Sequence, residues 1–304
     1  MQCAIFWIDL FALRRYWLGG FEEPGKRIGS ISRGKPMKQA IAIALVAFAL
    51  SSVSAGEYVV FVHGRSSNHC GTGTTDVNNY WGNAKNISTT LTKYFVGYDG
   101  STDPRSSGSC RAQTSMYTVM QAVCTGANSC VIICHSAGCY ATEYFLDKTT
   151  TTYNVKRILA SSSAAGGSDL ANAAFWPSDG MVTALKTSNA RGSYNHNNMK
   201  GIGVYAIAGY KGTFGASAIL PGEDDGAVSF HSTCGINTTG SYSNCLSGTR
   251  YSYHYIWNVV ANNSWGSSQN GYYRTHVGDG SDSINDATKN EWTDCKNGGY
   301  AGCK

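Results

Sequence analysis

The chain has 304 residues, of which 42% are hydrophobic and 14% are charged, and its formal net charge is +5 at pH 7. Seven of the 24 basic residues and three of the 19 acidic residues lie within residues 1–55, so residues 56–304 are almost neutral. No basic stripe runs along the sequence, and we therefore expect neither a nucleic acid nor an anionic membrane as a partner.

Residues 37–55 have the parts of a secretory signal peptide: a positive start, a short apolar core and the small-residue cleavage site Val53-Ser54-Ala55. We expect Met37 to be the true start and residues 1–36 to be a mis-assigned upstream extension; a two-part targeting sequence is the alternative. The mature chain would be residues 56–304, which is secreted or periplasmic and has the length of one domain. The sequence of that part contains no further apolar segment long enough to cross a membrane, so we expect no stable membrane anchor.

Ten of the eleven cysteines fall within residues 56–304, an even number in a chain that we expect to be exported. This pattern predicts a disulfide framework. Cys134 and Cys139 pair with each other, pair elsewhere or stay reduced, and the sequence leaves all three open. The sequence contains no C-x2-C pair, so we expect no metal site. The candidate pairs are Cys124–Cys130, Cys234–Cys245, Cys295–Cys303 and, over a longer span, Cys70–Cys110.

Short apolar runs alternate with segments of helical periodicity along the mature chain. This alternation predicts a single α/β domain with a mostly parallel central sheet and helices on both faces. The stretch Asp169–Met199 is predicted to be irregular, and the stretch Ser229–Asn270 is long and rich in Asn, Ser and Tyr. The predicted strands are Glu57–Gly64, Phe95–Tyr98, Cys130–Cys134, Val155–Ala160, Gly201–Ala208 and Gly271–Val277. The predicted helices are Tyr80–Tyr94, Arg111–Thr125, Tyr140–Lys148 and Ser281–Trp292.

One predicted strand ends directly at a serine. Residues 131–135 read Val-Ile-Ile-Cys-His, a run typical of a buried strand, and Ser136-Ala137-Gly138 follows at once. A serine between such a strand and a helix is typical of a nucleophile elbow, a sharp and often strained turn that exposes the serine Oγ. Small residues are needed two positions before and two positions after this serine. Here they are Cys134 and Gly138 rather than two glycines.

With this elbow in place, the chain resembles the α/β-hydrolase family, and within it the compact secreted bacterial lipases and esterases. Besides the elbow, His63-Gly64 follows the first mature strand, where the family places its oxyanion loop. The segment Asp225-Gly226-Ala227-Val228-Ser229 is similar to the D-G-x-V segment that carries the family's acid. His276 follows the last predicted strand, which gives the family's order of Ser, Asp and His. The resemblance implies a disulfide-stapled α/β-hydrolase catalytic domain over residues 56–304.

The roles follow from the chemistry of acyl transfer. Ser136 would attack an ester carbonyl after a base has taken its proton. His276 is the predicted base, because the pKa of histidine lies near neutrality, and Asp225 would orient and stabilise its charged ring. The N–H of Ala137 and, by the resemblance, the N–H of Arg65 would form the oxyanion hole. No cofactor is implied.

Two of these assignments have alternatives. His254 is the second candidate for the base, although it lies in an aromatic alternating stretch where a packed strand residue is the plainer interpretation. Asp224 is the second candidate for the acid, and the spacing to Val228 favours Asp225. His63 and His135 belong to motifs in which the imidazole usually holds a loop by hydrogen bonds.

Four aromatic residues in or near loops are candidates for lining an acyl pocket: Trp81, Phe175, Trp176 and Tyr210. Ordinary packing is the alternative for each of them. The irregular stretch that begins near residue 168 and ends at Met199 is either a small cap over the site or a static insertion.

Together these features predict an exported, monomeric serine carboxylic-ester hydrolase that works through an acyl-enzyme on Ser136. Its substrate would be a neutral or apolar ester, such as a lipid, a short acyl ester or a polyester of the kind that cutinase-like relatives attack. A non-catalytic secreted binding module on the same fold is one alternative, because a fold tolerates the loss of its chemistry. An acyltransferase that uses the same acyl-enzyme is another.

Overall fold

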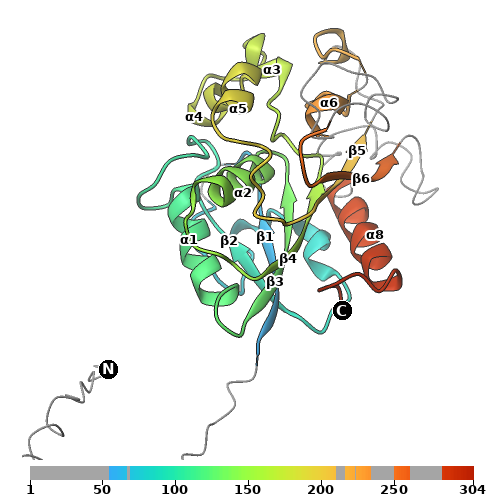
Figure 1. Cartoon of the computed structure of the whole chain (residues 1–304). Helices are drawn as coiled ribbons and strands as arrows, with labels where there is room; N and C mark the ends of the chain where they lie inside the picture. The colour runs from blue at the N-terminus through green and yellow to red at the C-terminus, as the bar shows by residue number, and fades with distance from the viewer. Residues whose placement is uncertain (1–54, 67–68, 210–215, 223, 234–249, 261–282) are drawn as a thin grey trace, which may run out of the picture. The chain divides into compact units, whose positions relative to one another are not determined.

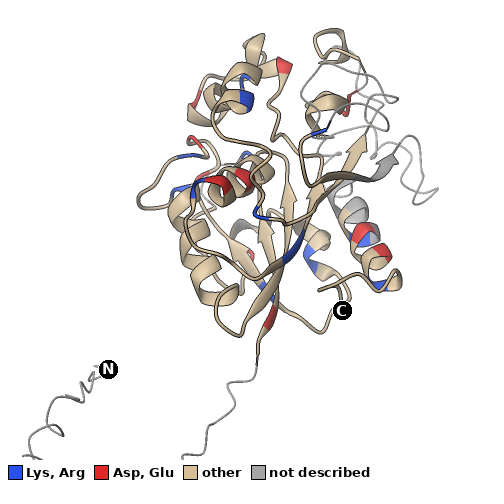
Figure 2. Ribbon diagram, viewed as in Figure 1, with Lys and Arg blue, Asp and Glu red and all other residues tan. Residues whose placement is uncertain are grey.

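The structure is a computed structural model, and it describes residues 55–66, 69–209, 216–222, 224–233, 250–260 and 283–304. All of them belong to the compact unit Ser52–Lys304. In the part of the chain that is described, no helix is both long enough and apolar enough to cross a membrane. In Figure 2 the ribbon positions of the basic and the acidic residues are interspersed, with no stripe of one sign among the residues coloured in that view.

A sheet of six parallel strands forms the centre of the described structure (Figure 1). The strand order is β2-β1-β3-β4-β5-β6, and each neighbouring pair is parallel. This confirms the predicted α/β class with a parallel central sheet. The strands are β1 (Glu57–Val62), β2 (Thr92–Val96), β3 (Ser129–His135), β4 (Val155–Ser161), β5 (Val204–Gly209) and β6 (His254–Val260).

Helices cover both faces of the sheet. Successive side chains of each strand point to opposite faces, so apolar residues lie on both faces and both must be buried. On one face, Val60 and Ile132 pack against α1 and α2, which contribute Met116 and Leu146 to the same cluster. On the other face, Val59, Phe61 and Ile133 pack with Trp81 and with Trp292 of α8. The helices are η1 (Val77–Asn79), η2 (Gly82–Asn86), α1 (Ala112–Val123), α2 (Ala137–Lys148), α3 (Asp169–Asn172), α4 (Gly180–Ala184), α5 (Thr187–Gly192), η3 (Ala216–Ala218), α6 (Phe230–Thr233) and α8 (Ser283–Asn297).

Four disulfides link described cysteines, which confirms three of the predicted pairs and settles a fourth. The predicted pairs are Cys70–Cys110, Cys124–Cys130 and Cys295–Cys303. Cys134 pairs with Cys139, one of the three states that the sequence left open. The candidate pair Cys234–Cys245 lies outside the described residues.

Two sequence predictions differ from the structure. The predicted helix Tyr80–Tyr94 is wrong: the 3-10 helix η2 is followed by β2 from Thr92, because Gly, Asn and Thr are poor helix formers. The long stretch Ser229–Asn270 contains α6 and strand β6, and β6 begins at His254, for which a packed strand residue was the plainer interpretation. The stretch Asp169–Met199 holds three short helices, α3 to α5. The predicted strand Gly271–Val277 lies outside the described residues.

Candidate active site

Ser136 occupies the turn between β3 and α2 in a strained backbone conformation. Its φ is 55° and its ψ is −130°, a combination that residues with a side chain rarely adopt. Its N–H donates to the carbonyl of Ser161 at 3.2 Å, and its carbonyl accepts the N–H of Ala164 at 3.0 Å. Hydrogen bonds to β4 and to the segment that follows it therefore hold the strained turn in place.

Two glycines allow other backbone segments to approach this turn. A Cβ on Gly138 would lie 2.3 Å from the carbonyl oxygens of both Val62 and His63. A Cβ on Gly64 would lie 2.7 Å from the Cβ of Ser136. The loop after β1 therefore packs directly on the elbow, and only glycine fits at these two positions without a shift of the backbone.

The predicted oxyanion donors lie on the two segments that are in contact here, the loop after β1 and the start of α2. Ala137 is the first residue of α2, so its N–H has no acceptor within the helix and lies at the positive end of the helix dipole. Arg65 directly follows Gly64, which contacts the elbow. The guanidinium of Arg65 forms an ion pair at 2.6 Å with Asp179, the residue that caps the N-terminus of α4. The ion pair ties the loop after β1 to the segment Asp169–Met199.

His63 and His135 hold the loops around the elbow. The Nδ1 of His63 donates to the carbonyl of Gly64 at 2.8 Å, and its Nε2 accepts the N–H of Tyr98 at 3.2 Å. Burial lowers the pKa of His63 to about 4, so the ring is neutral and both of its nitrogens are occupied. The Nδ1 of His135 lies 2.7 Å from the hydroxyl of Tyr80. Both imidazoles thus have the loop-holding contacts that the sequence analysis expected.

Asp225 lies in a tight turn in the connection after β5. The residue is 1% exposed, and its Oδ1 accepts the N–H groups of Ala227 at 3.0 Å and Val228 at 2.8 Å. Asp224 has different contacts: its Oδ1 accepts the hydroxyl of Ser217 at 2.9 Å and the N–H of Gly226 at 2.7 Å, and burial raises the pKa of its carboxyl. Both aspartates are fixed by their own turn, and Asp225 remains the predicted acid.

The two candidate bases are placed differently. His254 begins β6, whereas Ser136 follows the end of β3; because the strands are parallel, the two residues lie at opposite edges of the sheet. His276 lies outside the described residues, within the connection from the carboxyl end of β6 to α8. His254 is therefore too far from Ser136 to accept its proton, and His276 remains the predicted base.

His254 instead belongs to a buried polar cluster around Glu143 of α2, a residue that the sequence analysis did not single out. The Nε2 of His254 lies 3.1 Å from Glu143 Oε2, and the hydroxyl of Tyr194 donates to the same oxygen at 3.0 Å. The Nδ1 of His196 lies 3.7 Å from it. Glu143, His196 and His254 are each at most 5% exposed, so these contacts take place away from solvent.

The hydrogen bonds of His254 determine its protonation state. Its Nδ1 lies 3.0 Å from the carbonyl of Ser252, which can only accept, and its Nε2 faces the carboxylate of Glu143. Burial would lower the pKa of His254, but the charge of Glu143 outweighs it and raises the pKa. Burial would likewise raise the pKa of Glu143, but the charge of His254 and the hydrogen bonds from His196 and His254 lower it to about 2. The pair is a buried carboxylate–imidazolium ion pair.

The predicted substrate-contacting aromatics fall into different environments. Trp81 is 2% exposed and packs edge-on against Phe61 in the core. Phe175 is 53% exposed and contacts Trp176, which is partly buried against a small cluster that includes Leu170. Tyr210 lies outside the described residues. Phe175 and Trp176 are therefore the described candidates that reach the surface near the segments leaving the carboxyl edge of the sheet.

The segment Asp169–Met199 contacts both loops of the site. Asp179 pairs with Arg65 of the predicted oxyanion loop, and Asp169 accepts the hydroxyl of Ser229 next to the Asp225 turn at 3.2 Å. Met181 and several other side chains of this segment belong to the main core cluster. These contacts favour a static insertion over a cap that moves.

Among the residues that are described, no group of three or more His, Cys, Asp or Glu side chains is arranged to hold a metal ion. The described residues that the sequence predicts for the site supply a serine, a carboxylate and backbone amides. These are the groups that acyl transfer by a serine nucleophile requires, together with a base.

Solved structures similar to this chain are bacterial lipases and esterases. A lipase of Bacillus licheniformis in its mature form is 18% identical, with a TM-score of 0.49, over 78% of this chain and 89% of that one. A metagenomic carboxyl esterase is 13% identical, with a TM-score of 0.48, over 79% of this chain and 75% of that one. The Staphylococcus hyicus lipase is 11% identical, with a TM-score of 0.44, over 81% and 96%. No protein-family model and no curated protein matches the sequence.

Substitution of Gly138 tests the close approach at the elbow. We expect Gly138→Ala to lower the free energy of unfolding by about 1–3 kcal/mol, because its methyl group would meet two backbone carbonyls that cannot rotate away. Gly192→Ala at the end of α5 is the control, since a Cβ there meets nothing within 4 Å. Chemical denaturation of both variants measures the difference, and equal stabilities would contradict the packing described here.

The Glu143–His254 pair predicts a pH window of stability. The lowered pKa of Glu143 adds stability above its ordinary value of 4.5, and this is lost as the pH falls toward 2. The raised pKa of His254 adds stability below its ordinary value of 6.5, and this is lost as the pH rises through the folded-state pKa. Thermal unfolding between pH 5 and pH 9 should therefore show a fall in Tm above pH 6.5.

Glu143→Gln is the control for that window. We expect it to cost about 3–5 kcal/mol at pH 5, because it leaves the imidazole buried without its carboxylate, and to flatten the fall in Tm above pH 6.5. An NMR titration of the His254 ring in the unmodified protein gives the pKa directly, even if the variant does not fold. A pKa at or below 6.5 would contradict the ion pair.

Proposed function

We propose that this protein is an exported serine carboxylic-ester hydrolase that works through an acyl-enzyme on Ser136. The observation that carries the proposal is the strained turn of Ser136 between a central parallel strand and a helix, with the loop after β1 packed on it. Strained backbone concentrates at functional sites, and here the strain holds the residue type that acyl transfer needs. The buried Asp225 in the connection after β5 supports the same proposal, because this chemistry needs a carboxylate that orients the base.

In the proposed reaction, His276 takes the proton of the Ser136 hydroxyl as the Oγ attacks the ester carbonyl. The negative charge that develops on the carbonyl oxygen is stabilised by the N–H groups of Ala137 and Arg65. Asp225 orients the imidazole and stabilises its charged form. His276 then protonates the leaving alcohol, and the same imidazole activates the water that hydrolyses the acyl-enzyme.

We further propose that the substrate presents an apolar acyl group to Phe175 and Trp176. Leu170, Ala216 and Leu220 form a small buried cluster against which Trp176 packs, and Phe175 lies exposed beside Trp176. Leu170 belongs to α3, which follows β4, and Ala216 to η3, which follows β5. These segments leave the carboxyl edge of the sheet, the edge at which Ser136 lies, so an ester seated on Ser136 would extend toward them.

Export is the proposed destination of the chain. Its described residues contain four disulfides, and disulfides persist in oxidising compartments outside the cytosol. The signal peptide proposed at residues 37–55 gives the route. An exported hydrolase of neutral esters would act on lipids, short acyl esters or polyesters.

Replacement of the nucleophile tests the proposed chemistry. We expect Ser136→Ala to reduce kcat/KM for p-nitrophenyl acyl esters by at least about a thousandfold, because no other group forms the acyl-enzyme. Ser188→Ala, an exposed serine on α5, should leave turnover unchanged. A fluorophosphonate should label the unmodified protein and the Ser188→Ala variant but not Ser136→Ala. Labelling or turnover that survives Ser136→Ala would exclude this serine as the nucleophile.

A pair of exposed aromatics tests the apolar contact. Phe175 and Tyr117 are 53% and 54% exposed, and Tyr117 lies in the middle of α1, outside the segments that follow β4 and β5. We expect Phe175→Ala to raise KM for long acyl esters about fivefold to tenfold and to leave short ones unchanged, because the lost contact is apolar area. Tyr117→Ala should change neither. Equal effects of the two substitutions on a series of esters of graded chain length would contradict the assignment.

A further inference from the structure

A disulfide spans the turn that carries Ser136. It joins Cys134, two residues before the serine, to Cys139, three residues after it, and the two Cα atoms are 4.9 Å apart. Cys134 is the next-to-last residue of β3 and Cys139 lies in the first turn of α2. The cross-link therefore ties the end of the strand to the start of the helix on either side of the strained residue.

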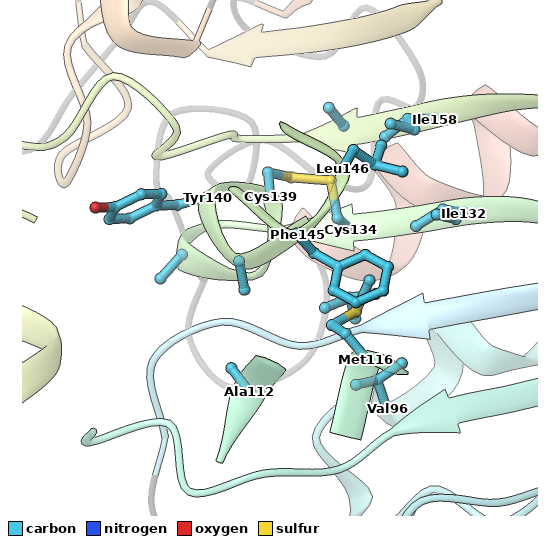
Figure 3. Packing of buried hydrophobic residues seen from close by; sticks show 14 of the residues in the cluster. Val96, Ala112, Met116, Ile132, Cys134, Cys139, Tyr140, Phe145, Leu146 and Ile158 are labelled. Carbon is cyan, nitrogen blue, oxygen red and sulfur yellow. A yellow bond between two sulfur atoms is a disulfide. The ribbon is translucent and has the colours of Figure 1, made fainter. Parts of the chain in front are cut away.

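The sulfur bridge lies inside the main hydrophobic core. Cys134 and Cys139 are both 0% exposed, and Figure 3 shows the bond among Leu146, Phe145 and Ile132. Thiol–disulfide exchange needs a thiolate to reach a sulfur atom, and the closed core prevents this while the protein is folded. The bond is thus a permanent constraint on the folded turn rather than an exchangeable one.

Backbone hydrogen bonds also constrain Ser136. Its N–H bonds to Ser161, and its carbonyl accepts the N–H groups of Ala164 and Cys139. These bonds fix the peptide groups on both sides of Ser136, but a relaxation of its φ toward the ordinary negative range would rotate the first turn of α2 away from β3. A covalent link between β3 and that first turn opposes this rotation directly.

We propose that Cys134 and Cys139 are positioning residues for the nucleophile: their disulfide holds Ser136 in the strained conformation that presents its Oγ to the substrate. The inference rests on the proposed function, since it assigns a role in the ester hydrolysis of Ser136. It predicts that loss of the bond lowers kcat more than it lowers binding, because a small displacement of a reacting atom acts on the chemical step.

A second disulfide on the same strand, Cys124–Cys130, is a matched control. Cys124 and Cys130 are also buried, belong to the same cluster and close a chain segment of similar length, with a separation of six residues against five. Their bond joins the end of α1 to the beginning of β3, at the opposite end of the strand from Ser136. Loss of this bond should cost stability without displacing the serine.

The experiment compares C134A/C139A with C124A/C130A in the full chain, assayed well below the Tm of either variant. Both should have a lower Tm than the unmodified protein. In C134A/C139A, kcat for a p-nitrophenyl ester and the rate of labelling by a fluorophosphonate should fall about tenfold or more, with KM within about twofold. In C124A/C130A, kcat and the labelling rate should stay within about twofold of the unmodified protein.

Equal kcat in the unmodified protein and C134A/C139A, or an equal fall in both variants, would overturn the inference. If C134A/C139A does not fold, C134A/C139V restores much of the lost volume without the cross-link. Hydrogen exchange of the segment around Ala137 is a readout without substrate: it should rise in the elbow variant and not in the control. If the unmodified protein neither turns over esters nor reacts with the probe, the proposed function fails, and unchanged exchange would independently overturn the role of the disulfide.

Discussion

The close contact of three backbone segments at one turn determines most of what this structure can do. A Cβ on Gly138 would meet the carbonyl oxygens of Val62 and His63 at 2.3 Å, and Ser136 bonds at the same time to Ser161 at the end of β4. Backbone atoms cannot rotate out of such a contact as side chains can. The position of Ser136 is therefore set by the packing of β1, β3 and β4, which are central strands of the sheet, and the loop after β1 is fixed relative to the serine by the same contact.

Helix α2 connects this turn to a second polar region with a different role. Its first residue, Ala137, presents an amide beside Ser136, and Glu143 lies about 9 Å farther along the helix. Glu143 receives hydrogen bonds from Tyr194 and His254, which belong to the segment before β5 and to the start of β6. A buried carboxylate that is paired in this way binds the outer half of the sheet to the helix that carries the elbow. The amino edge of the sheet thus has a structural ion pair, and the carboxyl edge has the groups proposed for chemistry.

The sequence predicted the parallel sheet and the elbow because both depend on local patterns. Buried parallel strands read as apolar runs, and the run that ends at Ser136 is followed at once by a helix. Strand β6 was indicated only by the aromatic alternation around His254, which lies within a long stretch rich in Asn and Ser. The contact between Glu143 and His254 was also missed, because 111 residues separate them and only the tertiary fold joins them. The pairing of Cys134 with Cys139 depends on the angle of the turn between them, which spacing alone does not give.

The segment Asp169–Met199 is anchored to both loops that carry predicted site residues. Asp179 binds Arg65 on the side of the predicted oxyanion loop, and Ser229, next to the Asp225 turn, binds Asp169. Met181 and Leu185, which follow Asp179, lie in the main core, so outward movement of the segment would expose apolar surface and break an ion pair at the same time. A segment anchored at Asp169 and Asp179 and packed on the core in this way is static. In the proposed reaction, the substrate would therefore meet a surface that is already formed rather than one that closes around it.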